Sequence, residues 1–248
     1  MDYESKGYGK SGELEFSKEL DWKIDHGRSR RKKQALILWS IIGIAFALVI
    51  IEILYTLNVI PHAYYSNEDF GISTYISQVD GDRDGVDDQT DILQGVRRYI
   101  ATKPQYKSVY YEGGWPTDGY GVCTDVVAQG FLHAGYDLRV LVNLDVTENP
   151  KAYNITKPDS NIDFRRVRNL KVFLERHAMV LTTDATQIEE WQGGDIVIYA
   201  GSHIGIVSDK RNAQGVCFLI HHGSPYQSAY EQDVLITCGE IVGHYRWR

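Results

Sequence analysis

The chain has 248 residues, of which 43% are hydrophobic and 24% are charged, and its formal net charge is −7. This balance is typical of a globular protein and excludes a fully disordered or collagen-like chain. The acidic charge excludes a globally basic nucleic-acid binder, and three cysteines are too few for a disulfide framework.

Residues 35–57 form an apolar run whose single charged side chain is Glu52. A helix of this length covers the roughly 30 Å hydrocarbon core of a bilayer, whereas a buried helix that is apolar on every face is usually shorter. The 34 residues in front of the run, and the absence of a nearby cleavage site, favour an uncleaved anchor over a signal peptide. We therefore expect residues 35–57 to be a single transmembrane helix.

Charges on either side of this run predict its orientation. Basic side chains crowd residues 28–33, and the first Lys or Arg after the run is Arg83. The positive-inside rule then places the N-terminus in the cytoplasm and residues 58–248 outside the cell. Residues 1–34 are rich in Gly, Ser and Tyr without an apolar period, so we interpret them as a disordered cytoplasmic tail. The exterior part divides into a membrane-proximal segment, 58–95, and a domain, 96–248.

The membrane-proximal segment contains an acidic loop, DGDRDGVDDQTD, at residues 80–91. Its spacing resembles dockerin and EF-hand-like calcium loops, although Asp87 stands where those loops have an aliphatic residue. The six or more oxygens that calcium prefers are predicted to come from these residues: Asp80, Asp82, Asp84, the Val86 carbonyl, Asp88 and Asp91. A solvated acidic turn is the alternative, but mutual repulsion of the acids favours a cation. We expect one structural calcium ion that ties this segment to the domain.

Cys123 stands at the start of a predicted helix, because apolar residues recur at helical spacing from Val122 until Gly135. The helix start favours a thiolate and supplies donors for an oxyanion, whereas a buried structural cysteine is the alternative. Strands predicted to follow Asp195, to begin at His203 and to cover residues 216–222 form a meander. A Cys-bearing helix on a meander that presents His203 and His221 is an arrangement of nucleophile, base and orienting residue.

The order of these motifs resembles the NlpC/P60 superfamily of papain-like cysteine hydrolases and, more closely, its DUF1287 branch. The matching segments are GVCTDVV (121–127), NIDFRRVRNL (161–170), WQGGDIVIY (191–199), HIGIVSD (203–209), IHHG (220–223) and GHYRW (243–247). The resemblance implies an α+β papain-like fold, in which the Cys-bearing helix packs on a small, mainly antiparallel sheet after one N-terminal transmembrane helix.

The resemblance also implies residue roles. Cys123 is the nucleophile, His203 the base and His221 the residue that orients His203. Tyr110 is expected near the oxyanion, with Tyr111 as its rival. The Thr-Asp pair after Cys123 departs from the Ser-Gly that NlpC/P60 members commonly have.

Two arginines in NIDFRRVRNL allow two interpretations. Arg165 and Arg166 are candidate substrate-binding residues that clamp a carboxylate of a wall peptide, because Arg recognises carboxylates through paired hydrogen bonds. A buried knot of salt bridges is the alternative. We expect Asp195 to stabilise the turn before its strand and His222 to face outward. Cys217 and Cys238 are a possible disulfide pair in an oxidising exterior.

The function implied by the resemblance is amide hydrolysis in cell-wall peptides, through a thioester, by a single-pass membrane protein whose C-terminal domain is extracellular. No cofactor is expected for catalysis, because the Cys and His spacing is not that of a closed zinc site. Two alternatives stay open: an acyltransferase on the same fold, and a non-catalytic, calcium-stabilised wall-binding module.

Overall fold

The computed structural model describes residues 10–247, with side chains from residue 15 onward. The chain divides between Thr56 and Leu57 into two compact units, of which the first holds helix α1 (Lys10–Thr56). The second unit holds the remaining helices, α2 (Asp88–Ala101), α3 (Cys123–His133), α4 (Leu138–Glu148), α5 (Pro150–Tyr153) and α6 (Val167–His177). Three short 3-10 helices are η1 (Glu68–Phe70), η2 (Asp163–Arg165) and η3 (Ile188–Glu190).

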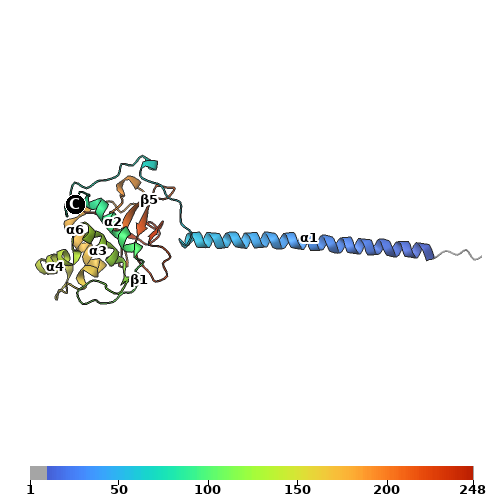
Figure 1. Ribbon diagram of the computed structural model, residues 1–248, viewed down its shortest axis with the longest axis horizontal. Helices are drawn as coiled ribbons and strands as arrows, with labels where there is room; N and C mark the ends of the chain where they lie inside the picture. The colour runs from blue at the N-terminus through green and yellow to red at the C-terminus, as the bar shows by residue number, and fades with distance from the viewer. Residues whose placement is uncertain (1–9, 248) are drawn as a thin grey trace, which may run out of the picture. The chain divides into compact units, whose positions relative to one another are not determined.

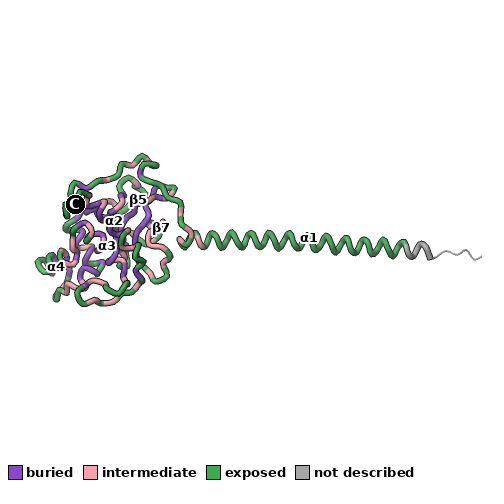
Figure 2. Tube along the Cα trace, in the orientation of Figure 1, coloured by how far each residue is buried: buried purple, intermediate pink, exposed green. Residues whose placement is uncertain are grey.

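Helix α1 is exposed along almost all of its described side chains (Figure 2). Its part Glu15–Thr56 is long and apolar enough, by length and composition, to cross a membrane. We expected residues 1–34 to be disordered. Residues 1–9 lie outside the described part of the chain, and residues 10–34 are helical and continuous with the apolar run. Once the apolar run has nucleated a helix, the Glu, Leu, Lys and Arg in front of it propagate that helix at little cost.

The second unit is a mixed α+β structure built on an antiparallel sheet (Figure 1). Its strands are β3 (Met179–Val180), β4 (Ile196–Tyr199), β5 (His203–Arg211), β6 (Cys217–Ile220), β7 (Glu231–Gln232) and β8 (Ile241–Arg246). They lie in the order β3-β8-β4-β5-β6-β7, and every neighbouring pair is antiparallel. The predicted meander is confirmed as β4, β5 and β6. A separate parallel pair joins β1 (Gln105–Tyr106) to β2 (Tyr120–Gly121).

Side chains alternate between the two faces of the sheet along each strand. Each face packs against its own hydrophobic core cluster. Ile196 and Ile198 belong to the larger core cluster, with apolar side chains of α2, α3, α4 and α6. Val197 and Tyr199 point the other way, into a smaller cluster that contains Trp191. The site residues on β5 and after β6 are therefore carried by strands that are fixed on both faces.

Helices α2 and α3 pack closely through small residues. A Cβ atom on Gly130 would lie 2.6 Å from Val96, and one on Gly95 would lie 2.4 Å from the His133 side chain. We expected a boundary between residues 95 and 96. That position falls inside α2, whose residues Ile92 and Val96 are fully buried in the larger core cluster. The helix that follows the acidic loop is thus part of the core, and Leu57–Arg248 forms one unit.

Candidate functional site

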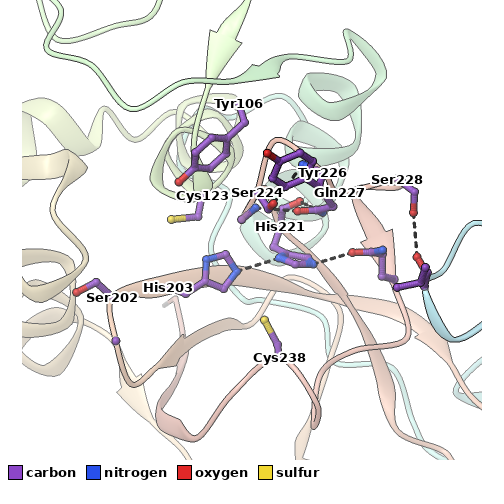
Figure 3. A pocket seen from close by; sticks show the side chains of 14 residues that line it. Tyr106, Cys123, Ser202, His203, His221, Ser224, Tyr226, Gln227, Ser228 and Cys238 are labelled. Atoms are coloured by element: carbon purple, nitrogen blue, oxygen red, sulfur yellow. Dashed lines mark hydrogen bonds between the residues drawn. The ribbon is translucent and has the colours of Figure 1, made fainter.

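A cavity of about 560 Å³ brings together the residues expected to form a nucleophile, a base and an orienting group (Figure 3). Cys123 comes from the first position of α3, His203 from the first position of β5, and His221 from the residue after β6. Among its other lining residues are Tyr106, Ser202, Ser224, Tyr226, Gln227, Gln232 and Cys238. The structure thus brings Cys123, His203 and His221 together in one cavity, and the catalytic roles expected of them stay a prediction.

The start of α3 is fixed by a buried ion pair. The carboxylate of Asp125 accepts a hydrogen bond of 2.8 Å from the N–H of Val122, the residue before Cys123. Arg165 donates two hydrogen bonds of 2.8 Å to the same carboxylate, and a third to the carbonyl of Val109. The backbone before Cys123 is therefore held in place by Asp125, in the first turn of α3, and by Arg165, in η2. The first N–H groups of any helix lack intrahelical acceptors, and the N–H of Thr124 lies beside the Cys123 sulfur.

The environment of the Cys123 thiol differs from the one we expected. Loss of solvent raises its pKa to about 11, although N–H groups of Ile204 and Thr124 beside the sulfur oppose that rise. The thiolate expected from the helix dipole is therefore not the resting form, because desolvation outweighs the dipole. Among the described residues, no hydrogen bond joins the Cys123 sulfur to the His203 ring. Such contacts often tighten only when substrate is bound.

A chain of hydrogen bonds runs from His203 to Gln232. His203 Nε2 lies 2.9 Å from His221 Nδ1, and His221 Nε2 lies 3.0 Å from Gln232 Oε1. Because an amide oxygen only accepts, His221 Nε2 carries a proton and its Nδ1 accepts from His203 Nε2. Neutral His203 then keeps its lone pair on Nδ1. Burial lowers the pKa of both histidines to about 4, so both rings are neutral at neutral pH.

Gln232 was missed by the sequence analysis. It lies on the two-residue strand β7, whose pairing with β6 brings it to His221. A strand this short leaves no period in the sequence, so no local signal marks Gln232 as a site residue.

A second thiol, that of Cys238, also belongs to this cavity. Its sulfur lies within 4.8 Å of the nearest ring nitrogens of His203 and His221. In Figure 3 Cys238 lies on the opposite side of the histidine pair from Cys123. The possible disulfide with Cys217 is absent, because both thiols are free. Cys217 is instead buried in the smaller core cluster, where its thiol donates to the Trp191 carbonyl at 3.7 Å.

Tyr106 occupies the place beside Cys123 for which we expected Tyr110. Tyr110 lines neither of the two cavities that contain Cys123, and its hydroxyl accepts a hydrogen bond from Asn161. Tyr106 lines both cavities, and Figure 3 shows its hydroxyl directed toward the Cys123 side chain. The two-residue pairing of β1 with β2 sets this position and cannot be read from the sequence.

The second cavity, of about 390 Å³, meets the first at Tyr106, Cys123 and Ser202. Arg165 and Arg166 both line it, but they differ in what their guanidinium groups do. Arg165 is occupied by Asp125 and the Val109 carbonyl, as the interpretation of a buried knot predicts, so it is not free to clamp a substrate. Arg166 and Arg168 are exposed along the same cavity. The anion-binding candidates are therefore Arg166 and Arg168.

Asp195 and His244 belong to a buried hydrogen-bond network that joins parts of the fold. The fully buried carboxylate of Asp195 accepts hydrogen bonds from Gln89, Gln192 and Arg246. His244 lies between this carboxylate, at 3.0 Å, and the Thr182 carbonyl, at 2.7 Å. Asp195 thus joins the turn before β4 to α2 and β8.

The acidic loop lies at the start of α2, and its residues divide into two groups. Carboxylate oxygens of Asp80, Asp82 and Asp84 gather within 4.8 Å of one another on the exposed side of the loop. Asp88 was expected to join them, but its oxygens accept hydrogen bonds from Gly81 N–H and the Tyr136 hydroxyl. Asp88 therefore holds the loop in place through both of its oxygens, one of them bonded to the Tyr136 side chain. Asp87 caps α2 by accepting from the Thr90 N–H.

Comparisons with known proteins agree with the DUF1287 part of the family resemblance. The family described as "Domain of unknown function (DUF1287)" matches residues 93–247. The chain is 36% identical over 168 residues to "Uncharacterized protein YijF" of Escherichia coli (strain K12), covering 63% of this chain and 80% of that protein. No solved structure matches the chain.

Proposed function

The chain belongs to the DUF1287 family, and from the geometry of its cleft we propose that it is a membrane-anchored cysteine hydrolase that cleaves an amide bond. The observation that carries this proposal is the hydrogen-bonded chain His203–His221–Gln232 in one cavity with Cys123. A nucleophile, a base and a group that orients the base are what acyl transfer to a thiol requires.

In the first half of the reaction, Cys123 Sγ attacks the carbonyl carbon while His203 Nδ1 takes the thiol proton. The tetrahedral intermediate collapses to a thioester when His203 returns that proton to the leaving amine. In the second half, His203 takes a proton from water, the resulting hydroxide attacks the thioester, and the carboxylic acid leaves as the thiol is restored. His221 holds the ring of His203 and stabilises its transient positive charge.

The resting protonation states favour proton transfer during attack over a preformed ion pair. The pKa of Cys123 is about 11 and that of His203 about 4, so the neutral thiol and neutral imidazole are the stable pair. A general base that acts in the transition state contributes typically about 10²- to 10⁴-fold to the rate. We expect bound substrate to exclude the remaining water and to bring Cys123 Sγ within hydrogen-bond distance of His203 Nδ1.

Stabilisation of the oxyanion is assigned to the start of α3 and to Tyr106. The N–H groups of Cys123 and Thr124 lie at the positive end of the helix dipole. The Tyr106 hydroxyl, which points toward the Cys123 side chain, is a third candidate donor (Figure 3). Donors of this kind are each worth about 10²- to 10³-fold in kcat in other hydrolases.

The substrate class that fits is a peptide with a free carboxylate near the scissile bond. Arg166 and Arg168 line the cavity that meets Cys123, and guanidinium groups bind carboxylates with two parallel hydrogen bonds. Cell-wall peptides carry such carboxylates. The long apolar helix, with its basic residues 28–33, supports attachment to a membrane with residues 58–248 facing the wall.

We also assign the domain to the papain-like NlpC/P60 superfamily. The support for this assignment is the order of elements: a helix that begins with Cys123, an antiparallel meander that begins with His203, and a third polar residue, His221, after the next strand.

The proposal is tested by digestion of cell-wall fragments with the full-length protein in detergent micelles. Mass spectrometry follows new amine termini for the wild type, Cys123→Ala and Cys217→Ser. We expect Cys123→Ala to lower cleavage at least about 10³-fold. Cys217→Ser is the matched control, because its buried side chain lies in the smaller cluster and a serine hydroxyl still donates to Trp191.

Each other outcome favours a different function. Cleavage that survives Cys123→Ala would remove the nucleophile from the proposal. Wall binding by the wild type without cleavage would favour the binding module. Products joined to an added acceptor amine, in preference to water, would identify an acyltransferase.

A further inference from the structure

We propose that the loop 80–91 binds one calcium ion through Asp80, Asp82, Asp84, the Val86 carbonyl and Asp91, and that this ion fixes α2 against the Cys-bearing helix α3. This inference does not depend on the proposed chemistry of the cleft. It rests on a buried carboxylate that lacks a hydrogen-bonding partner beside the acidic loop.

Asp91 is the observation that points to a ligand. Its side chain is 1% exposed, and neither carboxylate oxygen has a hydrogen-bond partner among the described residues. Burial raises the pKa of this carboxyl, and the charges of Asp84, Asp82 and Asp80 add to the rise, whereas His133 opposes it. A buried carboxylate without a partner is costly unless a cation offsets its charge. Asp91 is thus a buried, unpartnered carboxylate in the first turn of α2, directly after the loop that carries the three exposed acids.

His133 is the protein's own candidate partner for Asp91, and it fits poorly. Its Nδ1 lies 3.7 Å from an Asp91 oxygen, which is beyond hydrogen-bond distance, and neither ring nitrogen has a hydrogen-bond partner. The imidazole therefore leaves both oxygens of Asp91 available to a metal ion.

The loop backbone already has the curl that a cation requires. Asp80 accepts hydrogen bonds from the N–H groups of Arg83 and Gly85, so the chain wraps around its carboxylate. Gly85 has φ +97°, a left-handed conformation that glycine adopts without strain. Helix α2 then begins at Asp88, which places Asp91 in its first turn.

The donor set favours calcium. Four carboxylates and one carbonyl supply six oxygens if Asp91 binds through both of its own, which is within the six to eight that calcium takes. Asp88 is committed to Gly81 and Tyr136, so water completes the coordination on its side. Magnesium holds its waters more tightly and prefers fewer carboxylates.

The loop also contacts the end of α3. A Cβ on Gly135 would lie 2.9 Å from the Asp82 side chain, and one on Gly81 would lie 2.5 Å from the Tyr136 hydroxyl. An ion held by Asp82 and by Asp91 therefore links the chain just after α3 to the first turn of α2. Because α2 and α3 pack through Gly95 and Gly130, the ion secures the helix that begins with Cys123.

The test is thermal unfolding of the full-length protein in detergent, stripped with a chelator and then titrated with calcium chloride. At calcium concentrations about 100 times its dissociation constant, we expect the melting temperature to rise by about 5 °C or more. The variant D82N/D84N, at two exposed positions, abolishes this rise. Glu148→Gln, an exposed acid on α4 outside the loop, is the matched control and keeps it.

Asp91→Asn separates a ligand from a residue that is merely structural. In chelator we expect this variant to be at least as stable as the wild type, because it removes an uncompensated buried charge. In calcium it is the less stable of the two, because it has lost a ligand. Hydrogen exchange provides a second readout, in which calcium slows exchange of residues 92–101 and 126–133 in the wild type alone.

Three results would overturn the proposal. The first is an unchanged melting temperature at millimolar calcium. The second is an equal rise in D82N/D84N, and the third is an equal rise with magnesium.

Discussion

Two buried carboxylates near opposite ends of α3 differ in how their charge is compensated. Asp125, in the first turn of α3, is held by two hydrogen bonds from Arg165 and caps the Val122 N–H. Asp91 faces His133, the last residue of α3, and has no hydrogen-bond partner among the described residues. The helix start that carries Cys123 is thus held by the protein's own side chains, whereas we propose that a calcium ion compensates the charge at the other end.

The largest expected effect comes from breaking the Arg165–Asp125 ion pair at the start of α3. Arg165→Met leaves Asp125 buried without its cation, and we expect a loss of about 3–5 kcal/mol in the free energy of unfolding. Urea unfolding at constant calcium measures it. Arg166→Met, at the exposed neighbouring arginine, is the control and changes stability by no more than about 0.5 kcal/mol. Equal effects of the two variants would show that the Arg165–Asp125 pair does not hold the helix start.

The next effect sharpens the role of the histidine chain. His221→Ala removes the group that orients His203, and we expect kcat to fall about 10²-fold with KM little changed. Gln232→Glu places a negative charge beside His221, which raises the pKa of both rings. The acid limb of the pH profile, expected near the His203 pKa of about 4, then moves upward. A role in folding alone would leave that limb in place.

The pH dependence of stability tests whether His203 and His221 are buried as neutral rings. The folded-state pKa of His203 and His221 is about 4, below the ordinary value of 6.5, so the unfolded chain binds more protons between these pH values. Stability is full above pH 6.5 and falls as the pH drops toward 4. At pH 5 each histidine accounts for a loss of about 2 kcal/mol. Unfolding of H203Q/H221Q at pH 7 and pH 5 measures this contribution, and a pH dependence equal to that of the wild type would refute it.

The smallest effect concerns Cys238. With His203 and His221 it forms a His–His–Cys set of the kind that zinc binds. We expect zinc to occupy both rings, to inhibit cleavage and to protect Cys238 from alkylation. Cys238→Ser should weaken the affinity for zinc about tenfold, because a hydroxyl is a poorer ligand than a thiolate. Zinc inhibition that is unchanged in this variant would place the metal elsewhere.

Features with a local pattern were predictable from the sequence. The apolar run, the helix that begins at Cys123 and the strand that begins at His203 each follow from a period and its boundary residues. The acidic loop followed from its own spacing. Arg165 and Arg166 are adjacent and chemically alike, so only packing reveals that Asp125 occupies the first and leaves the second exposed.

Features created by pairing between distant segments were not predictable. Tyr106 and Gln232 lie on two-residue strands, and Cys238 follows a turn in which its N–H donates to the Val234 carbonyl. A two-residue strand is too short to show a period in the sequence. The turn that carries Cys238 is brought to His203 by the pairing of the whole sheet. The resting thiol of Cys123 was also missed, because its pKa depends on burial that local sequence does not show.

The most direct measurement is the location of the acyl group during turnover. The full-length protein is mixed with wall peptides, quenched in acid and mapped by mass spectrometry for a hydroxylamine-sensitive adduct. We expect the adduct on Cys123, absent in Cys123→Ala and retained in Cys217→Ser. An adduct on Cys238, or turnover without any thioester, would contradict the assignment of Cys123 as the nucleophile.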